Sequence, residues 1–244
     1  MIHVVTGKVG AGKSLWVMGQ SIQHLINGGV VASNMTIHLD AVRRIYHRRI
    51  APWQLVHIEA TSDPREIPVG DLRGHGRRKV MVVLDECLNW FQSEGKSVAG
   101  DERKRLWSEW LRQSDKLGQQ VFFVAQNFER AAKWIRELAQ VAVNICNFGQ
   151  IRLFGLPVGR WCHMEHLGLA VAWDVASKQR LWTSFVTLTP RVWDCYETAE
   201  LYGFDAASSA YLATTWPAYH LPGVRLLWIP CGWLVVRGLV EIFR

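Results

Sequence analysis

A glycine-rich segment that follows a short strand-like run constrains this chain more than any other feature of its sequence. Gly7, Gly12, Lys13 and Ser14 match the pattern G-x-x-x-x-G-K-[ST] of a phosphate-binding loop. Such a loop works between a buried strand and a helix, and residues 2–5 supply an apolar, β-branched strand. Apolar side chains then recur at helical spacing at Leu15, Trp16, Met18, Ile22 and Leu25. The sequence therefore predicts a strand, a phosphate loop and a helix, in this order.

The chemistry of this loop assigns a role to its residues. Glycines let backbone N–H groups close around phosphate oxygens, and the helix that follows presents its positive dipole end to the same charge. We expect Lys13 to contact the β- and γ-phosphates of ATP and Ser14 to ligate Mg²⁺. The predicted nucleotide-binding residues are Gly7, Lys8, Val9, Gly10, Ala11, Gly12, Lys13, Ser14 and Leu15. A glycine-rich turn without a ligand is the alternative, and the complete motif with both flanks argues against it.

A second apolar run, residues 80–84, ends abruptly in the acidic pair Asp85 and Glu86. In a parallel sheet the apolar run is buried and the acidic pair emerges at the carboxyl edge, where ligands of open α/β sheets bind. We expect Asp85 to hold Mg²⁺, directly or through water, and Glu86 to orient and activate the attacking water. An exposed acidic strand end without a function is the alternative.

Strands and helices alternate along the first 150 residues. Strands are predicted at residues 30–33, 121–125 and 141–146, helices at residues 101–117 and about 130–139, and loops over most of residues 50–78. This alternation is typical of the α/β P-loop NTPase class, with a mostly parallel sheet flanked by helices. Beyond Gln150, short strand-like pieces predict antiparallel additions to the sheet. Trp173, Trp182 and Trp193 are expected to be packing residues, with a stacking surface for single-stranded nucleic-acid bases as the alternative.

Gln126 ends the predicted strand at residues 121–125. In P-loop enzymes, a polar residue at the tip of the strand beside the acidic strand commonly senses the γ-phosphate. Gln126 is therefore the candidate sensor, and a strand cap without a function is the alternative.

The composition and the last residues bear on partners and location. Lys and Arg number 28 against 21 Asp and Glu, a balance that suits nucleic acid or an anionic membrane surface. Five scattered cysteines with no C-x-x-C pair suggest neither disulfides nor zinc, which fits a reducing compartment. Residues 226–236 are apolar but shorter than the roughly 20 residues of a membrane span, and Arg225 and Arg237 bracket them. A marginal span, an amphipathic helix on a membrane or partner subunit, and a buried final helix remain open, and we expect membrane association.

Four segments together resemble a known family: "VTGKVGAGKSL", "VVLDECLNWF", "KLGQQVFFVAQ" and "RVWDCYETAELYG". Over residues 1–203 the chain resembles the assembly ATPases of filamentous bacteriophages, the gene I or zonular occludens toxin-like proteins. The resemblance implies an ATPase domain at residues 1–203 on the cytoplasmic side of the host inner membrane. For residues 204–244 we expect an apolar C-terminal tail with a membrane-associated helix. Since the sequence ends at Arg244, we expect no substantial periplasmic domain.

The resemblance also implies partners and an activity. Proteins of this family power phage assembly and extrusion through the inner membrane, as single-stranded-DNA-binding protein is exchanged for coat protein. Expected partners are therefore further copies of this chain arranged as a ring, phage coat and export proteins, single-stranded phage DNA and the inner membrane.

Residue by residue, the resemblance supports the phosphate loop, the acidic pair and Gln126, and it exposes one departure. Relatives tend to have Arg or His before the "KLG"-like stretch, where this sequence has Asp115 followed by Lys116. If that basic residue serves a neighbouring subunit's nucleotide, the role passes to Lys116 or Arg112, or is missing.

The leading interpretation is an ATP-hydrolysing motor of phage assembly, and two alternatives stay open. A small-molecule kinase would use Arg73, Arg77 and Arg78 as a lid, although Glu86 favours water as the phosphate acceptor. A membrane-docking or toxin-like module would keep nucleotide only as a structural ligand.

Overall fold

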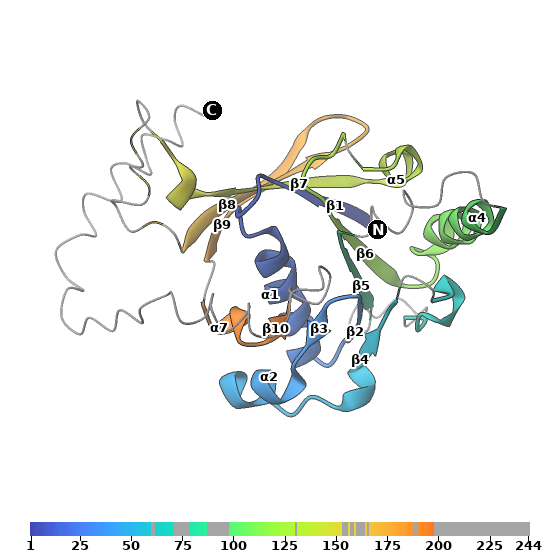
Figure 1. The fold of residues 1–244 in the computed structure, drawn as a ribbon, viewed down its shortest axis with the longest axis horizontal. Helices are drawn as coiled ribbons and strands as arrows, with labels where there is room; N and C mark the ends of the chain where they lie inside the picture. Colours follow the sequence, from blue (N-terminus) through green and yellow to red (C-terminus); the bar gives the residue numbers. More distant parts are fainter. Residues whose placement is uncertain are drawn as a thin grey trace. The chain divides into compact units, whose positions relative to one another are not determined.

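Within the described residues of the computed structural model, six parallel strands and two antiparallel ones form one sheet (Figure 1). The structure describes residues 1–59, 62–70, 79–86, 98–129, 131–152, 156, 159, 164, 166–187 and 190–197. The strand order is β4 (Leu55–His57), β2 (Val30–Ser33), β5 (Val80–Asp85), β6 (Gln119–Val124), β1 (Ile2–Thr6), β7 (Val141–Asn147), β8 (Leu167–Asp174) and β9 (Arg180–Thr187). Strands β8 and β9 are the antiparallel ones, which confirms the predicted additions.

Helices cover both faces of this sheet (Figure 1). The helices are α1 (Lys13–Ile26), α2 (Leu39–Tyr46), α4 (Val98–Gln113), α5 (Lys133–Leu138) and α7 (Pro190–Trp193). Because side chains alternate along a strand, β1 sends Val5 to the core that contains α1 and Val4 to the core that contains α4 and α5. Figure 1 accordingly shows α1 and α4 on opposite sides of β5 and β6.

The last described strand, β10 (Tyr196–Glu197), returns to the N-terminal half of the chain. It pairs antiparallel with β3 (Thr36–Ile37), and the pair forms a second, two-stranded sheet. The Cys195 carbonyl accepts a 2.8 Å hydrogen bond from the His38 backbone N–H. This pairing brings residues from the end of the described chain close to the segment that follows β2.

Several predicted boundaries shift in the structure. Helix α4 ends at Gln113 rather than at residue 117, because the chain turns there and Gly118 adopts a left-handed φ of 65°. Helix α2 and strand β4 lie in regions for which no such element was predicted. Trp173, Trp182 and Trp193 are partly exposed rather than buried, although Trp182 lies 6.4 Å from Trp16, ring centroid to centroid.

The predicted apolar tail, residues 204–244, lies outside the described residues. Among the residues that are described, no helix has the length and apolar character that a membrane crossing requires.

His3 makes the core of β1 sensitive to acid. Its ring stacks on Phe122 with centroids 4.6 Å apart, and the Gln120 side-chain amide lies 3.0 Å from its Nε2. Burial, together with the positive N-terminus, lowers the pKa of His3 from 6.5 to about 4. The folded protein therefore holds this ring in its neutral form.

We expect the substitution His3→Phe to reduce the amount of unfolding free energy that the protein loses when the pH is lowered. Since the folded pKa lies below the unfolded value, the unfolded chain binds the extra proton first, and stability falls as the pH drops from 6.5 towards 4. The shift corresponds to a loss of about 3 kcal/mol of unfolding free energy between pH 7 and pH 4. The variant should not show this loss. Urea denaturation at both pH values measures it, and equal losses in the two proteins would contradict the assignment.

Candidate functional site

The phosphate loop connects the end of β1 to the start of α1, as predicted. Gly10 and Gly12 adopt left-handed φ angles of 73° and 85°, which few other residues tolerate. Gly12 is the N-cap of α1 and provides no side chain, and the first turn of α1 has no acidic residue. The backbone N–H groups and the positive dipole end of α1 therefore face an anion without competition from a capping side chain.

The loop is held against β7 and the segment after it. A Cβ atom on Gly7 would lie 2.4 Å from the Ile145 carbonyl oxygen, so only glycine fits there. Further along, the Gln150 side-chain amide donates a 2.9 Å hydrogen bond to the Val9 carbonyl. Gln150 carries no motif signal, and its bond to the loop is visible only in the structure.

Lys13 lies across the loop that precedes it. Its Nζ donates to the carbonyl oxygens of Gly7 and Lys8 at 3.0 and 3.1 Å. Burial lowers the pKa of Lys13, and the negative charges of Asp85 and Glu86 oppose this shift. The ammonium group is thus within electrostatic reach of both predicted carboxylates.

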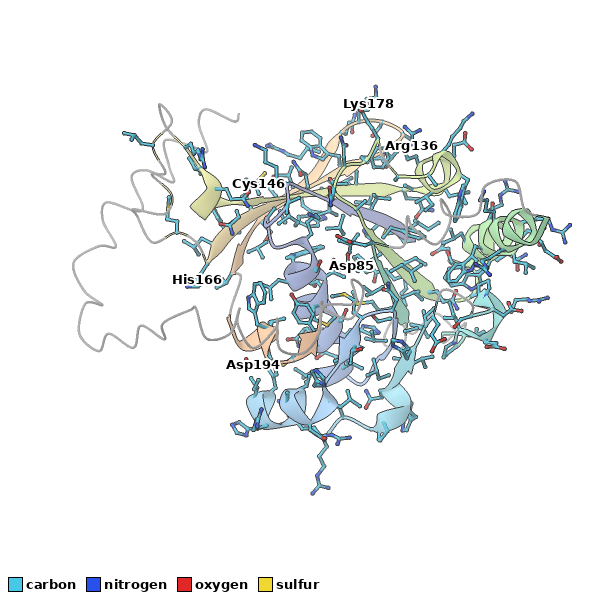
Figure 2. All side chains as sticks on the ribbon, in the orientation of Figure 1. Asp85, Arg136, Cys146, His166, Lys178 and Asp194 are labelled. Carbon is cyan, nitrogen blue, oxygen red and sulfur yellow. The ribbon has the colours of Figure 1, made fainter. Side chains whose placement is uncertain are left out.

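Ser14 and Asp85 lie close together, because the Ser14 hydroxyl favours the charged form of the Asp85 carboxylate and so acts to lower its pKa. Asp85 is 3% exposed and lies in the interior of the molecule (Figure 2). Burial raises its pKa to about 6. The nearby Ser14 hydroxyl and the charge of Lys13 oppose the rise, and the charge of Glu86 adds to it. The residues around Asp85 therefore compensate the negative charge of its carboxylate only in part.

These oxygens fit Mg²⁺. Asp85 Oδ1 is fully buried and has no hydrogen-bond partner within the described part of the chain. Mg²⁺ prefers hard oxygen ligands, and nucleotide sites hold it with one or two protein oxygens plus phosphate oxygens and waters. Within the described ranges no cluster of three or more His, Cys, Asp or Glu side chains forms a cage made of protein alone. Ser14 and Asp85 are the residues that could hold Mg²⁺ bound to a nucleotide.

Glu86 lies at the first position after β5. Its φ of 49° is left-handed, which is strained for a residue with a side chain, and its backbone N–H donates a 3.2 Å hydrogen bond to the Val124 carbonyl of β6. The chain therefore leaves the strand at this residue, beside the carboxyl end of β6.

Gln126 lies at the same edge of the sheet as the phosphate loop. Strand β6 lies between β5 and β1 and runs parallel to both, so the carboxyl ends of all three strands share one edge. Gln126 follows β6 directly after Ala125, whose N–H donates to the Val5 carbonyl at 2.9 Å, and its side chain is exposed. This placement suits a sensor, and that role stays a prediction.

Arg112 and Lys116 lie at the opposite edge. Both residues precede β6, near the amino ends of the strands, and both side chains are exposed. At about 3.3 Å per strand residue, β6 separates them from the phosphate loop by roughly 20 Å. They cannot contact a nucleotide bound to their own chain, and a role on a neighbouring copy's nucleotide stays a prediction. Arg73, Arg77 and Arg78, the predicted kinase lid, lie outside the described residues.

Two residues beside Asp85 escaped the sequence analysis. The Asn34 side chain forms two hydrogen bonds with the backbone of Asp85. Tyr196 of β10 is buried, and both its burial and the nearby charge of Asp85 raise its pKa. Asn34 follows a predicted strand, as Gln126 does, so the same reasoning about polar strand ends could have found it.

Comparisons with known proteins agree with these motifs. The family model described as "Zonular occludens toxin (Zot)" matches residues 1–164, which include the phosphate loop and the acidic pair. The gene 1 protein of Enterobacteria phage I2-2 is 30% identical over 147 residues, or 59% of this chain and 40% of the relative. That of Salmonella phage IKe is 29% identical over 147 residues, with the same coverage. The match thus spans less than half the length of these relatives.

A solved structure is also similar. The crystal structure of the N-terminal domain of zonular occludens toxin from Neisseria meningitidis aligns with 80% of this chain and 98% of its own, at 16% identity and a TM-score of 0.46.

We expect Gly7→Ala to damage the loop and Gly19→Ala to be harmless. The added Cβ collides with the Ile145 carbonyl in the first variant, whereas nothing lies within 4 Å of it in the second. Strain of this kind costs roughly 1–3 kcal/mol of unfolding free energy, while alanine in a helix interior gains roughly 0.5–1 kcal/mol over glycine. Chemical denaturation and binding of a fluorescent ATP analogue measure both effects. Equal behaviour of the two variants would show that Gly7 is not constrained as described.

Proposed function

Because the chain belongs to the zonular occludens toxin (Zot) family, we propose that it is an ATP-hydrolysing motor that drives assembly and extrusion of filamentous phage through the host inner membrane. The observation that carries the proposal is the buried carboxylate of Asp85, whose Oδ1 has no hydrogen-bond partner among the described residues, beside Ser14 of the phosphate loop and with Glu86 next in the chain. A carboxylate beside the metal-binding one is what hydrolysis needs in addition to nucleotide binding.

In this mechanism the residues of the loop bind and orient the nucleotide. The N–H groups of the loop and of the first turn of α1 hold the phosphates, and Lys13 moves from the loop carbonyls to the β- and γ-phosphates. Ser14 and Asp85 would hold Mg²⁺, which would neutralise charge on the transferred phosphoryl group. Glu86 accepts a proton from water as the water oxygen attacks the γ-phosphorus and the bond to ADP breaks.

The partners belong to the same proposal. The relatives that match over 59% of this chain are gene 1 proteins of phages, which supports phage coat and export proteins as partners and the inner membrane as the place of work. Further copies of the chain, arranged as a ring, would let a basic residue of one copy act on the nucleotide of the next. Single-stranded phage DNA suits the net charge of +7.

We expect the purified protein to hydrolyse ATP at a rate per subunit that rises cooperatively with protein concentration. Lys13→Ala should lose nucleotide binding, because it removes the cation that contacts the phosphates. Glu86→Gln should bind ATP and lower turnover by roughly 10²- to 10⁴-fold, the usual contribution of a general base. Release of inorganic phosphate without an added acceptor measures turnover and separates hydrolysis from a kinase reaction.

Lys133 and Glu137 offer matched controls. They form an exposed ion pair on α5, with Nζ and Oε1 3.7 Å apart, away from the loop. Lys133→Ala and Glu137→Gln repeat the two charge changes and should leave turnover unchanged. If the wild type binds ATP but hydrolyses it no faster than Glu86→Gln does, a module that keeps nucleotide as a structural ligand becomes the better account.

A further inference from the structure

Asn34 binds the backbone of Asp85 at two points. It follows β2, is 9% exposed, and its Nδ2 donates to the Asp85 carbonyl oxygen at 2.8 Å. Its Oδ1 accepts from the Asp85 N–H, also at 2.8 Å. The orientation of the amide is fixed by chemistry, because the flipped group would place oxygen against oxygen and N–H against N–H. The side chain thus extends the pairing of β2 with β5 by one residue.

These two bonds bear on the direction of both predicted carboxylates, the metal ligand Asp85 and the catalytic Glu86. The Asp85 N–H belongs to the peptide unit before this residue, and its carbonyl belongs to the peptide unit that leads into Glu86. Holding both units fixes the φ and ψ angles of Asp85 between them. The Asp85 side chain and the start of Glu86 are therefore aimed by Asn34.

The opposite side of the same backbone is held by β6. The Glu86 N–H donates to the Val124 carbonyl at 3.2 Å, and Glu86 has its left-handed φ of 49° at this point. A strained backbone persists only where its surroundings over-determine it. Asn34 from the β2 side and Val124 from the β6 side supply this constraint.

Asn34 is itself firmly anchored. Its backbone N–H donates to the Val83 carbonyl at 3.3 Å, and the next residue, Met35, donates to the Ser33 hydroxyl at 2.9 Å. Strand β3 begins at Thr36 and pairs with β10. The amide therefore has a rigid support on both sides in the chain.

On the basis of the proposed function, we propose that Asn34 is a positioning residue that aims Asp85 at Mg²⁺ and Glu86 at the attacking water. It contacts neither the nucleotide nor the metal, and acts through the backbone of Asp85. Outer groups that orient metal ligands typically contribute roughly 10- to 100-fold in metal affinity or activity.

The chain offers a matched control for this role in Gln54. Its side-chain amide is 5% exposed and also binds only backbone, donating to Leu25 and Gly29 at 3.0 and 2.9 Å and accepting from Ala51 at 2.8 Å. Loss of either amide should lower the melting temperature. Only the loss of Asn34 should change the chemistry of the site.

The test compares Asn34→Ala with Gln54→Ala by two measurements. The first is the Mg²⁺ concentration that half-saturates binding of a fluorescent ATP analogue, and the second is kcat for ATP hydrolysis. For Asn34→Ala we expect the Mg²⁺ requirement to rise and kcat to fall, each by roughly 10- to 100-fold. Binding of the analogue in EDTA should stay as in wild type, because the phosphate loop is intact. Gln54→Ala should match wild type in all three.

A second variant, Asn34→Asp, guards against misfolding of the first. It keeps the size of the side chain and the acceptor for the Asp85 N–H, but removes the donor to the Asp85 carbonyl. Its added negative charge alone would tighten Mg²⁺ binding. A higher Mg²⁺ concentration for half-saturation would therefore report lost positioning. Asn34 variants with wild-type Mg²⁺ dependence and kcat would overturn the proposal. If wild type binds nucleotide without turnover, the proposed function fails, and the Mg²⁺ titration alone decides the role of Asn34.

Discussion

The close approach of the Ser14 hydroxyl to the Asp85 carboxylate is the contact on which the rest of the site depends. It joins the phosphate loop after β1 to the acidic end of β5, although β6 lies between these strands. The contact forms because α1 begins at Lys13 and carries Ser14 over the sheet, while the three parallel strands end at one edge. The order β5-β6-β1 therefore leaves room for a third contributor, Gln126, between the loop and the carboxylates.

The burial of Asp85 has an energetic cost that a ligand can relieve. Asp85 is buried with one carboxylate oxygen that has no hydrogen-bond partner within the described residues, and its pKa rises to about 6. Burial of a charge without full compensation destabilises the folded protein. Mg²⁺ bound there with a nucleotide, as proposed, would add positive charge beside Asp85 and would stabilise the fold by mass action. Without a ligand, the buried Asp85 thus lowers the stability of the folded protein.

Local signals predicted most of the fold, and contacts between distant segments explain the rest. The phosphate loop, the strand that ends in Asp85 and the antiparallel additions each have a pattern within a short stretch of sequence. The bond between Asn34 and Asp85, and the pairing of Tyr196 with Ile37, depend on how strands assemble, so no local pattern encodes them. Partial exposure of Trp173 has a similar cause, since it depends on which elements cover β8.

The positions of Arg112 and Lys116 constrain any assembly in which they meet a nucleotide. Each copy carries its phosphate loop at the carboxyl edge of the sheet and these cations at the amino edge. A cation from one copy reaches a phosphate of another only if the amino edge of the first faces the carboxyl edge of the second. Such a contact joins two different surfaces. Repeated head to tail it gives a closed ring or an open filament, and in a two-fold symmetric dimer it occurs twice, with the two copies side by side in opposite directions. Any assembly that uses Arg112 or Lys116 in this way therefore brings opposite edges of the sheets of neighbouring copies together.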